Sequence, residues 1–148
     1  MFTIERCDRI DPRWIALRAE LWPDLTIEQH QDDLAKLRAI DSRPLVGFLA
    51  IENQQAIGFA EAALRRAGVN GCDTLNVAFL EGIWVQPAHR RRGIGRALIE
   101  ATEKWARSVG CKEFGSDALL ENTMGQTMHH ALGFEETERV VYFRKKLT

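Results

Sequence analysis

The sequence contains few of the residues that mark secreted, metal-binding or membrane proteins. Only three of its 148 residues are cysteines, Cys7, Cys72 and Cys111, and no two of them form a C-x-x-C pair. This predicts neither a disulfide framework nor a zinc site, so we expect reduced thiols, a cytoplasmic protein and no metal. No apolar run reaches about 18 residues, which predicts no transmembrane helix. The opening stretch, Phe2 to Arg6, has no long apolar core, so we expect no signal peptide.

An excess of charge of one sign is also missing, as are repeats and low-complexity segments. The 20 lysines and arginines nearly balance the 21 aspartates and glutamates, for a formal net charge of −1. A non-specific nucleic-acid-binding protein would normally be basic, so we expect neither nucleic acid nor a membrane as partner. The length suits one domain, and 45% hydrophobic residues can fill one core. We therefore treat residues 1–148 as a single domain.

Strand-like and helix-like hydrophobic patterns alternate along the chain. Strands are predicted at Phe2–Arg6, Leu45–Ile51, Ala56–Leu64, Val77–Val85, Cys111–Ser116 and Val140–Phe143. Helices are predicted after Asp11-Pro12 up to Pro23, after Thr26, from Gly93 to Gly110 and from Asn122 to Leu132. The order indicates an α/β (α+β) domain with a mixed sheet and about four helices.

The second predicted helix begins with a capping box formed by Thr26 and Gln29. Its apolar side chains, which we expect to face the core, are Ile27, Leu34, Leu37 and Ile40. His30 falls near that stripe, where a structural or solvated role is the simplest interpretation.

The most informative segment is Arg90-Arg91-Arg92-Gly93-Ile94-Gly95, between the apolar run Phe79–Val85 and a strongly helical run. Glycine permits close approach of a phosphate to the backbone. The first N–H groups of a helix have no intrahelical partner, and the helix dipole favours an anion there. Arginine side chains add positive charge. The segment predicts a pyrophosphate site, although a solvated arginine run before a helix is the simpler alternative.

Two nucleotide motifs fit this segment poorly. A Walker loop needs Lys-Ser or Lys-Thr after the second glycine, where this chain has Arg96-Ala97. The dinucleotide fingerprint needs a third small residue, where this chain has Leu98.

The run from Trp84 to Leu98 resembles the acetyl-CoA motif of the GNAT acetyltransferases, whose signature Arg/Gln-x-x-Gly-x-Gly/Ala is matched by Arg90, Gly93 and Gly95. A second motif of that family follows from Asn122 to Phe134. The resemblance implies a GNAT fold: a mixed, mostly antiparallel sheet splayed between two parallel strands that admit the pantetheine arm. It implies acetyl-CoA as cosubstrate, bound through Ile83, Trp84, Val85, Arg90, Arg91, Arg92, Gly93, Ile94, Gly95, Arg96 and Asn122.

The second motif departs from the family pattern at one position. His129 stands where a tyrosine usually serves as general acid toward the departing thiolate, and the only tyrosine of this chain is Tyr142. His129, if protonated, or a water would take that role; a packing role is equally open. Asn122 offers an amide to pantetheine, and a plain helix N-cap is its alternative.

Several segments together resemble aminoglycoside 6′-N-acetyltransferases, including Leu21-Trp22-Pro23, Val69 to Asp73 and Ala131 to Arg139. The resemblance implies Trp22 as a wall of the sugar site and Glu138 as a substrate carboxylate, offered across a homodimer interface by the last strand. Core packing and a solvated strand face are the respective alternatives. An aromatic residue that some related enzymes place before Val69 is replaced here by Ala67-Gly68, which puts affinity and drug range in doubt.

Carboxylates at the ends of two predicted strands suit a polycationic acceptor. Glu81 precedes the cofactor motif and Asp117 ends the next strand, where ligands collect in open α/β sheets. Acids there would bind an ammonium group and remove its proton, which is held with a reference pKa of about 10.4. Glu81, directly or through water, is the first candidate and Asp117 the second. An exposed strand acid and a turn cap are the alternatives.

We therefore predict transfer of acetyl from acetyl-CoA to the 6′-amine of an aminoglycoside by direct attack, with resistance as the outcome. Two alternatives stay open. One keeps the cofactor and changes the acceptor to a polyamine, a small amine or a protein N-terminus. The other is an inactive acyl-CoA-binding module, which the missing tyrosine favours and the pair Glu81 and Asp117 opposes.

Overall fold

The computed structural model describes residues 1–39 and 44–148, and its described strands form one mixed sheet. The strands lie in the order β1 (Thr3–Cys7), β2 (Leu45–Glu52), β3 (Gln55–Arg65), β4 (Val77–Val85) and β5 (Phe114–Gly115). The first four are antiparallel and β5 runs parallel to β4. This confirms the predicted mixed, mostly antiparallel sheet that ends in a parallel pair.

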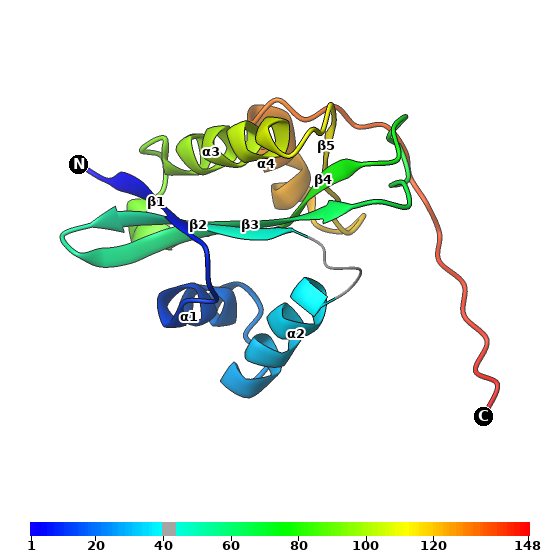
Figure 1. The fold of residues 1–148 in the computed structure, drawn as a ribbon, viewed down its shortest axis with the longest axis horizontal. Coiled ribbons are helices and arrows are strands. Elements are labelled where there is room, and N and C mark those ends of the chain that lie inside the picture. The colour runs from blue at the N-terminus through cyan, green and yellow to red at the C-terminus, as the bar shows by residue number, and fades with distance from the viewer. Residues whose placement is uncertain (40–43) are drawn as a thin grey trace.

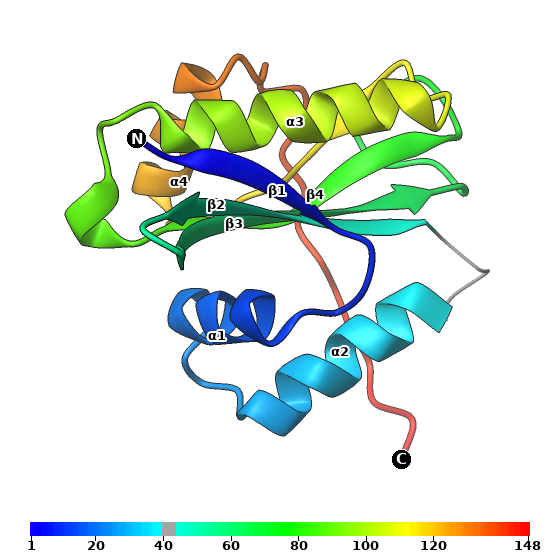
Figure 2. The same cartoon turned by 60° about the vertical axis from the view of Figure 1, so that its left-hand side comes forward.

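Helices cover both faces of the sheet (Figures 1 and 2). On one side lie α1 (Pro12–Leu21) and α2 (Ile27–Ala39); on the other lie α3 (Ile94–Ser108) and α4 (Thr123–Ala131). A short 3-10 helix, η2 (Pro87–His89), connects β4 to the loop before α3. The predicted capping box is confirmed, because the Gln29 amide N–H donates to the Thr26 hydroxyl and the Thr26 amide N–H to the Gln29 side chain.

Each sheet face carries its own core cluster. The stripe of α3, including Ile94, Leu98 and Trp105, packs on the β2–β4 face. On the opposite face Trp14 of α1 is completely buried among side chains of α1, α2, β2 and β3. Gly47 of β2 permits this packing, because an added Cβ would lie 2.6 Å from the Trp14 ring. The two clusters fix α1 and the start of α3 against the same central strands.

The last predicted strand, Val140–Phe143, is wrong for the isolated chain. Residues 134–148 form an extended, strand-free tail that leaves the domain (Figure 1), and the Phe143 side chain is 92% exposed. A strand needs a hydrogen-bonding neighbour, and the tail pairs with none of the described strands. The strand predicted at Cys111–Ser116 shortens to the two residues of β5.

The second helix also differs from its prediction in one side chain. Leu34 is buried, but Ile27, the first residue of the helix, is 48% exposed. Ile40 lies outside the described residues. His30, by contrast, is completely buried, so its structural interpretation is confirmed. No helix in the described chain is long and apolar enough to cross a membrane.

Candidate active site

The C-terminal half of β4 has one open edge. On one side Ile83, Trp84 and Val85 pair with β3. On the other side β5 pairs only with Ala78 and Phe79, and no other described strand covers the edge beyond Phe79. The outward N–H and C=O groups of this segment can therefore pair with an extended ligand as an added strand would, except for the Val85 carbonyl, which accepts from Arg90.

The loop after β4 ends in a backbone cradle. Gly93 has φ +80° and is the N-cap of α3, a left-handed conformation that glycine adopts without strain. The first intrahelical bond runs from the Ala97 N–H to the Gly93 carbonyl, which leaves the N–H groups of Ile94, Gly95 and Arg96 without intrahelical partners. A Cβ added at Gly93 or Gly95 would meet no atom within 4 Å. The cradle is thus open and suited to an anion such as a pyrophosphate.

The arginine side chains around the cradle mainly brace its shape. The Arg92 guanidinium pairs with Glu52 of β2, and this contact, helped by the N-terminal amine, lowers the pKa of Glu52 to about 2. Arg90 donates to the Val85 carbonyl (2.8 Å) and stacks over Trp84, 4.6 Å from the ring centre. The anion-binding groups on offer are therefore chiefly backbone N–H groups, with the arginines supplying positive potential.

The start of α4 presents Asn122 and a glycine beside it. The Asn122 Oδ1 accepts from the Gly125 N–H (2.9 Å), so Asn122 is the N-cap of the helix. A Cβ at Gly125 would lie 2.5 Å from the Asn122 amide nitrogen, so only glycine permits this cap. The N-cap alternative for Asn122 is the observed one, and it leaves the amide NH₂ as a further donor.

His129 uses both ring nitrogens within the domain. Its Nδ1 donates to the Gly125 carbonyl (2.6 Å), and its Nε2 lies 2.7 Å from the Ser116 hydroxyl. Because a carbonyl only accepts, the proton of a neutral ring sits on Nδ1 and the Ser116 hydroxyl donates to Nε2. Ser116 is a candidate functional residue that sequence reasoning missed, and its only signal was its place directly before Asp117 at the end of a strand.

Glu81 lies at a β-bulge. Glu61 pairs with Gly82 and Ala62 with Leu80, so Glu81 is the extra residue of β4. Its carboxylate accepts from the Arg65 guanidinium through Nε (3.2 Å) and Nη2 (3.1 and 3.0 Å). The guanidinium stacks on Phe79, with its central carbon 3.6 Å from the ring centre. Sequence reasoning missed Arg65, since 16 residues separate it from its partner.

Trp22 stands beside the same bulge, at the end of α1. A Cβ added at Gly82 would lie 2.5 Å from the Trp22 ring, so the indole lies directly on β4. Its backbone is fixed at both polar groups: the N–H donates to the Arg18 carbonyl (2.9 Å), and the carbonyl accepts from His30 Nε2 (3.0 Å). The Arg18 guanidinium lies 4.8 Å from the ring centre.

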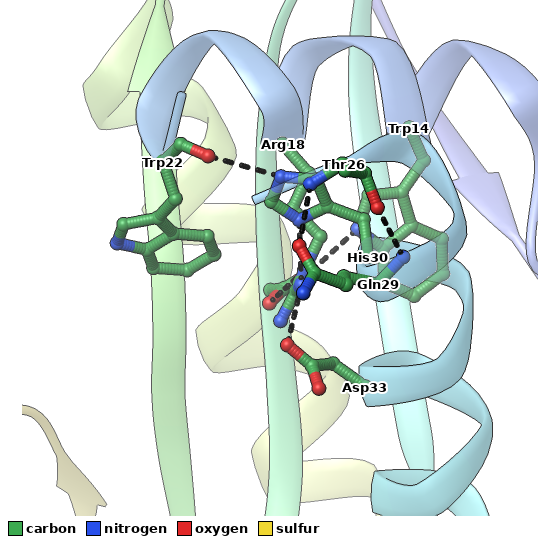
Figure 3. A network of polar contacts seen from close by, with 8 residues as sticks. Trp14, Arg18, Trp22, Thr26, Gln29, His30 and Asp33 are labelled. Carbon is green, nitrogen blue, oxygen red and sulfur yellow. Dashed lines mark hydrogen bonds and ion pairs between the residues drawn. The ribbon is translucent and has the colours of Figure 1, made fainter. Parts of the chain in front are cut away.

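A buried polar network stands behind Trp22 (Figure 3). Arg18 donates to both oxygens of Glu61 (2.9 Å each) and through Nη1 to His30 Nδ1 (3.0 Å), while the Trp14 indole donates to Glu61 (2.6 Å). Burial raises the pKa of Glu61, and the charge of Arg18 opposes that rise. Because His30 accepts at Nδ1, its proton sits on Nε2, where it holds the Trp22 carbonyl.

Asp117 and Glu138 are exposed and line one open hollow, together with Arg65, Phe79 and His129. The start of the tail closes one side of it, since a Cβ at Gly71 would collide with Thr137. Glu81 and Trp22 are not among the residues that line this hollow. Two of the predicted substrate carboxylates thus border the same hollow, whereas Glu81 does not line it and pairs with Arg65.

The family model of the Acetyltransferase (GNAT) family matches residues 14–134, which include the open strand edge, the cradle and α4. The chain belongs to this family of acetyltransferases. In this GNAT acetyltransferase, the open edge of β4 and the glycine cradle lie in the segments where the sequence predicted the acetyl-CoA site.

Several similar proteins within this family are aminoglycoside 6′-N-acetyltransferases. The acetyltransferase is 46% identical over 133 residues, 90% of each chain, to an aminoglycoside N(6′)-acetyltransferase type 1 of Salmonella typhimurium. The crystal structure of the aminoglycoside 6′-N-acetyltransferase AAC(6′)-Ih from Acinetobacter baumannii superposes with a TM-score of 0.87 at 43% identity, covering 100% of both chains. AAC(6′)-Iy in complex with the bisubstrate analog CoA-S-monomethyl-acetylneamine gives a TM-score of 0.86 at 41% identity, with 99% of both chains covered.

Proposed function

We propose that this acetyltransferase moves the acetyl group of acetyl-CoA to the 6′-amino group of an aminoglycoside, by direct attack of the amine. The observation that carries the proposal is that one domain holds an anion cradle at the start of α3 together with two carboxylates, Glu81 in β4 and Asp117 just after β5. A relative that shares 41% of its sequence and nearly its whole fold accommodates an analog joining CoA to an acetylated aminoglycoside.

The residues fit acetyl-CoA, which supplies a thioester carbonyl when it is bound. The N–H groups of Ile94, Gly95 and Arg96 would hold the pyrophosphate, and the open backbone of Ile83–Val85 would pair with the pantetheine arm. The Asn122 amide NH₂ would reach the same arm. Holding two reactants in one orientation supplies a large part of the rate enhancement in acyl transfer.

The carboxylates receive the acceptor. Asp117 and Glu138 bind ammonium groups in the hollow, and Glu81 receives the reacting amine and, directly or through water, its proton. Trp22 forms an apolar wall beside the bulge. After transfer, the Ser116 hydroxyl would give its proton to the departing thiolate, while a protonated His129 would give its Nε2 proton to the Ser116 oxygen and become neutral.

A thiol-release assay tests the proposal. Acetyl-CoA would be offered with aminoglycosides that carry or lack a 6′-amine, with polyamines and with peptides. We expect thiol release only with 6′-amino aminoglycosides. Activity confined to polyamines or peptides would favour the alternative acceptors, and CoA binding without any turnover would favour an inactive acyl-CoA-binding module.

The enzyme also acts, in this proposal, as a cytoplasmic homodimer. Three free thiols, Cys7, Cys72 and Cys111, suit a reducing compartment. The tail carries exposed Val141, Tyr142 and Phe143, residue types that favour strands, and β5 offers only two paired residues. An exposed apolar strand without a partner pairs readily with another chain, so the tail of one subunit would complete the sheet, and the Glu138 position, of its partner.

A further inference from the structure

The Arg65–Glu81 pair blocks the carboxylate that is expected to receive the reacting amine. Both Glu81 oxygens accept from Arg65 at 3.0–3.2 Å. The guanidinium stacks on the Phe79 ring. This contact limits the rotation of the Arg65 side chain and interacts favourably with its positive charge. The Glu81 side chain is 15% exposed and that of Arg65 35%. In the free protein, a cation therefore already fills this site.

Arg65 also borders the acceptor hollow. The hollow that holds Asp117 and Glu138 is lined by Arg65 and Phe79 but not by Glu81. An amine in the hollow can therefore contact the Arg65 guanidinium, which occupies the Glu81 carboxylate. Arg65 ends β3, directly before the loop that borders the hollow, so its long side chain can swing aside without moving the sheet.

We propose that Arg65 is a gate on Glu81: its guanidinium occupies the cation site of the carboxylate, and the acceptor's ammonium group must displace it. This inference rests on the proposed function, because it assumes a cationic acceptor at Glu81. To bind Glu81, the acceptor must break the Arg65–Glu81 ion pair, which lowers its binding affinity. An acceptor with several ammonium groups offsets that cost at Asp117 and Glu138, whereas a monoamine has nothing to set against it. The gate thereby selects for polycations.

Replacement of Arg65 by glutamine tests the gate. We expect Arg65→Gln to bind neamine, a small aminoglycoside, about two- to fivefold more tightly by calorimetry, as expected for loss of a partly exposed ion pair. The dependence of neamine affinity on salt should steepen, because the site loses one positive charge, and CoA affinity should stay unchanged. Arg6→Gln is the matched control: it removes the same charge from β1, where Arg6 pairs with Asp8, and should leave neamine affinity unchanged.

Two further variants make the test specific. In a Glu81→Gln background, Arg65→Gln should give no gain, because the cation site is already lost. Arg65→Lys keeps the charge but loses the two-oxygen contact and should give a smaller gain; it serves as the test if Arg65→Gln fails to fold.

The outcomes separate the gate from the proposed function. If the wild-type enzyme binds and acetylates neamine while Arg65→Gln binds it equally or more weakly, the gate is wrong and the proposed function stands. If neither protein binds neamine, the proposed acceptor class is wrong and the gate falls with it.

Discussion

Gly93 shows how one backbone conformation determines a binding site. Its φ of +80° and the open space where a Cβ would point leave room for a ligand oxygen close to the chain. We expect Gly93→Val to lower CoA affinity at least tenfold, because a β-branched residue is strained in this conformation by about 1–3 kcal/mol and its side chain fills the cradle. Calorimetry with CoA measures the effect. The matched variant Gly110→Val also changes a positive-φ glycine in open space, at the other end of α3, and should spare CoA binding; unchanged affinity in Gly93→Val would contradict the cradle.

Asp117 is the acid whose role is easiest to separate from folding, because its side chain is exposed. Asp117→Asn removes the charge and keeps the shape. We expect aminoglycoside binding to weaken about fivefold or more, as for loss of a charge-assisted contact, with acetyl-CoA affinity nearly unchanged. Titrations of the variant with both ligands measure this. Equal loss of both affinities would mean that Asp117 is structural.

The Glu52–Arg92 pair links the cradle to the pH dependence of stability. The pKa of Glu52 is lowered from 4.5 to about 2, chiefly by its hydrogen bond with Arg92. A lowered pKa in the folded state adds stability above the unfolded-state pKa and loses it as pH falls from about 4.5 to 2. We expect Glu52→Gln to flatten that part of the curve of unfolding free energy against pH. Denaturant unfolding at several pH values measures this curve. If the variant lost as much stability as the wild type over the same acidic range, the assignment to Glu52 would be wrong.

Single residues also show what the sequence predicts well. A glycine motif before a helix defines the cradle because its chemistry is local: backbone conformation, free N–H groups and a helix dipole act within a few residues. The Arg65–Glu81 contact is not local. It depends on the extra residue that the bulge inserts into β4, and no spacing rule in the sequence places Glu81 beneath that guanidinium.

Among the elements, the junction of α1 and α2 does most to position Trp22, the proposed wall of the acceptor site. Arg18 of α1, His30 of α2 and Glu61 of β3 form one buried network that ends at the Trp22 carbonyl (Figure 3). Sequence periodicity predicted both helices and placed His30 near an apolar stripe, with a structural or solvated role. It did not predict the network, because the network depends on how α1 crosses β3, which is a property of the packed domain.

Two substitutions of His30 distinguish positioning from simple stabilisation. Gln can keep the donation to the Trp22 carbonyl, while Asn reaches only toward Arg18. Each loses one buried hydrogen bond, so both should cost about 1–3 kcal/mol of unfolding free energy. We expect the aminoglycoside KM to rise clearly in His30→Asn and little in His30→Gln, with the acetyl-CoA KM unchanged in both. Steady-state kinetics measures the two values, and equal acceptor KM values in two equally destabilised variants would reduce His30 to a stability role.

At the scale of the whole molecule, the tail is the segment whose structure in the isolated chain differs most from the prediction made from its sequence. The run of β-branched and aromatic residues at Val140–Phe143 is typical of a strand, yet the single chain pairs it with none of its described strands. Periodicity reports that a segment is suited to pairing, but not with which chain. A second subunit would pair with this segment as a strand and cover the exposed side chains of Val141, Tyr142 and Phe143.

Complementation tests whether two subunits build each acceptor site. We expect Asp117→Asn and Glu138→Gln homodimers each to bind aminoglycoside weakly. If the tail crosses to the partner, a mixed dimer contains one site with both changes and one site with neither. Refolding an equal mixture should then restore wild-type affinity at about a quarter of all sites, because half of the dimers are mixed. If each tail stays with its own chain, every site keeps one change and no wild-type fraction appears. A single weak class of sites in the mixture, with light scattering showing dimers, would place Glu138 in the site of its own subunit.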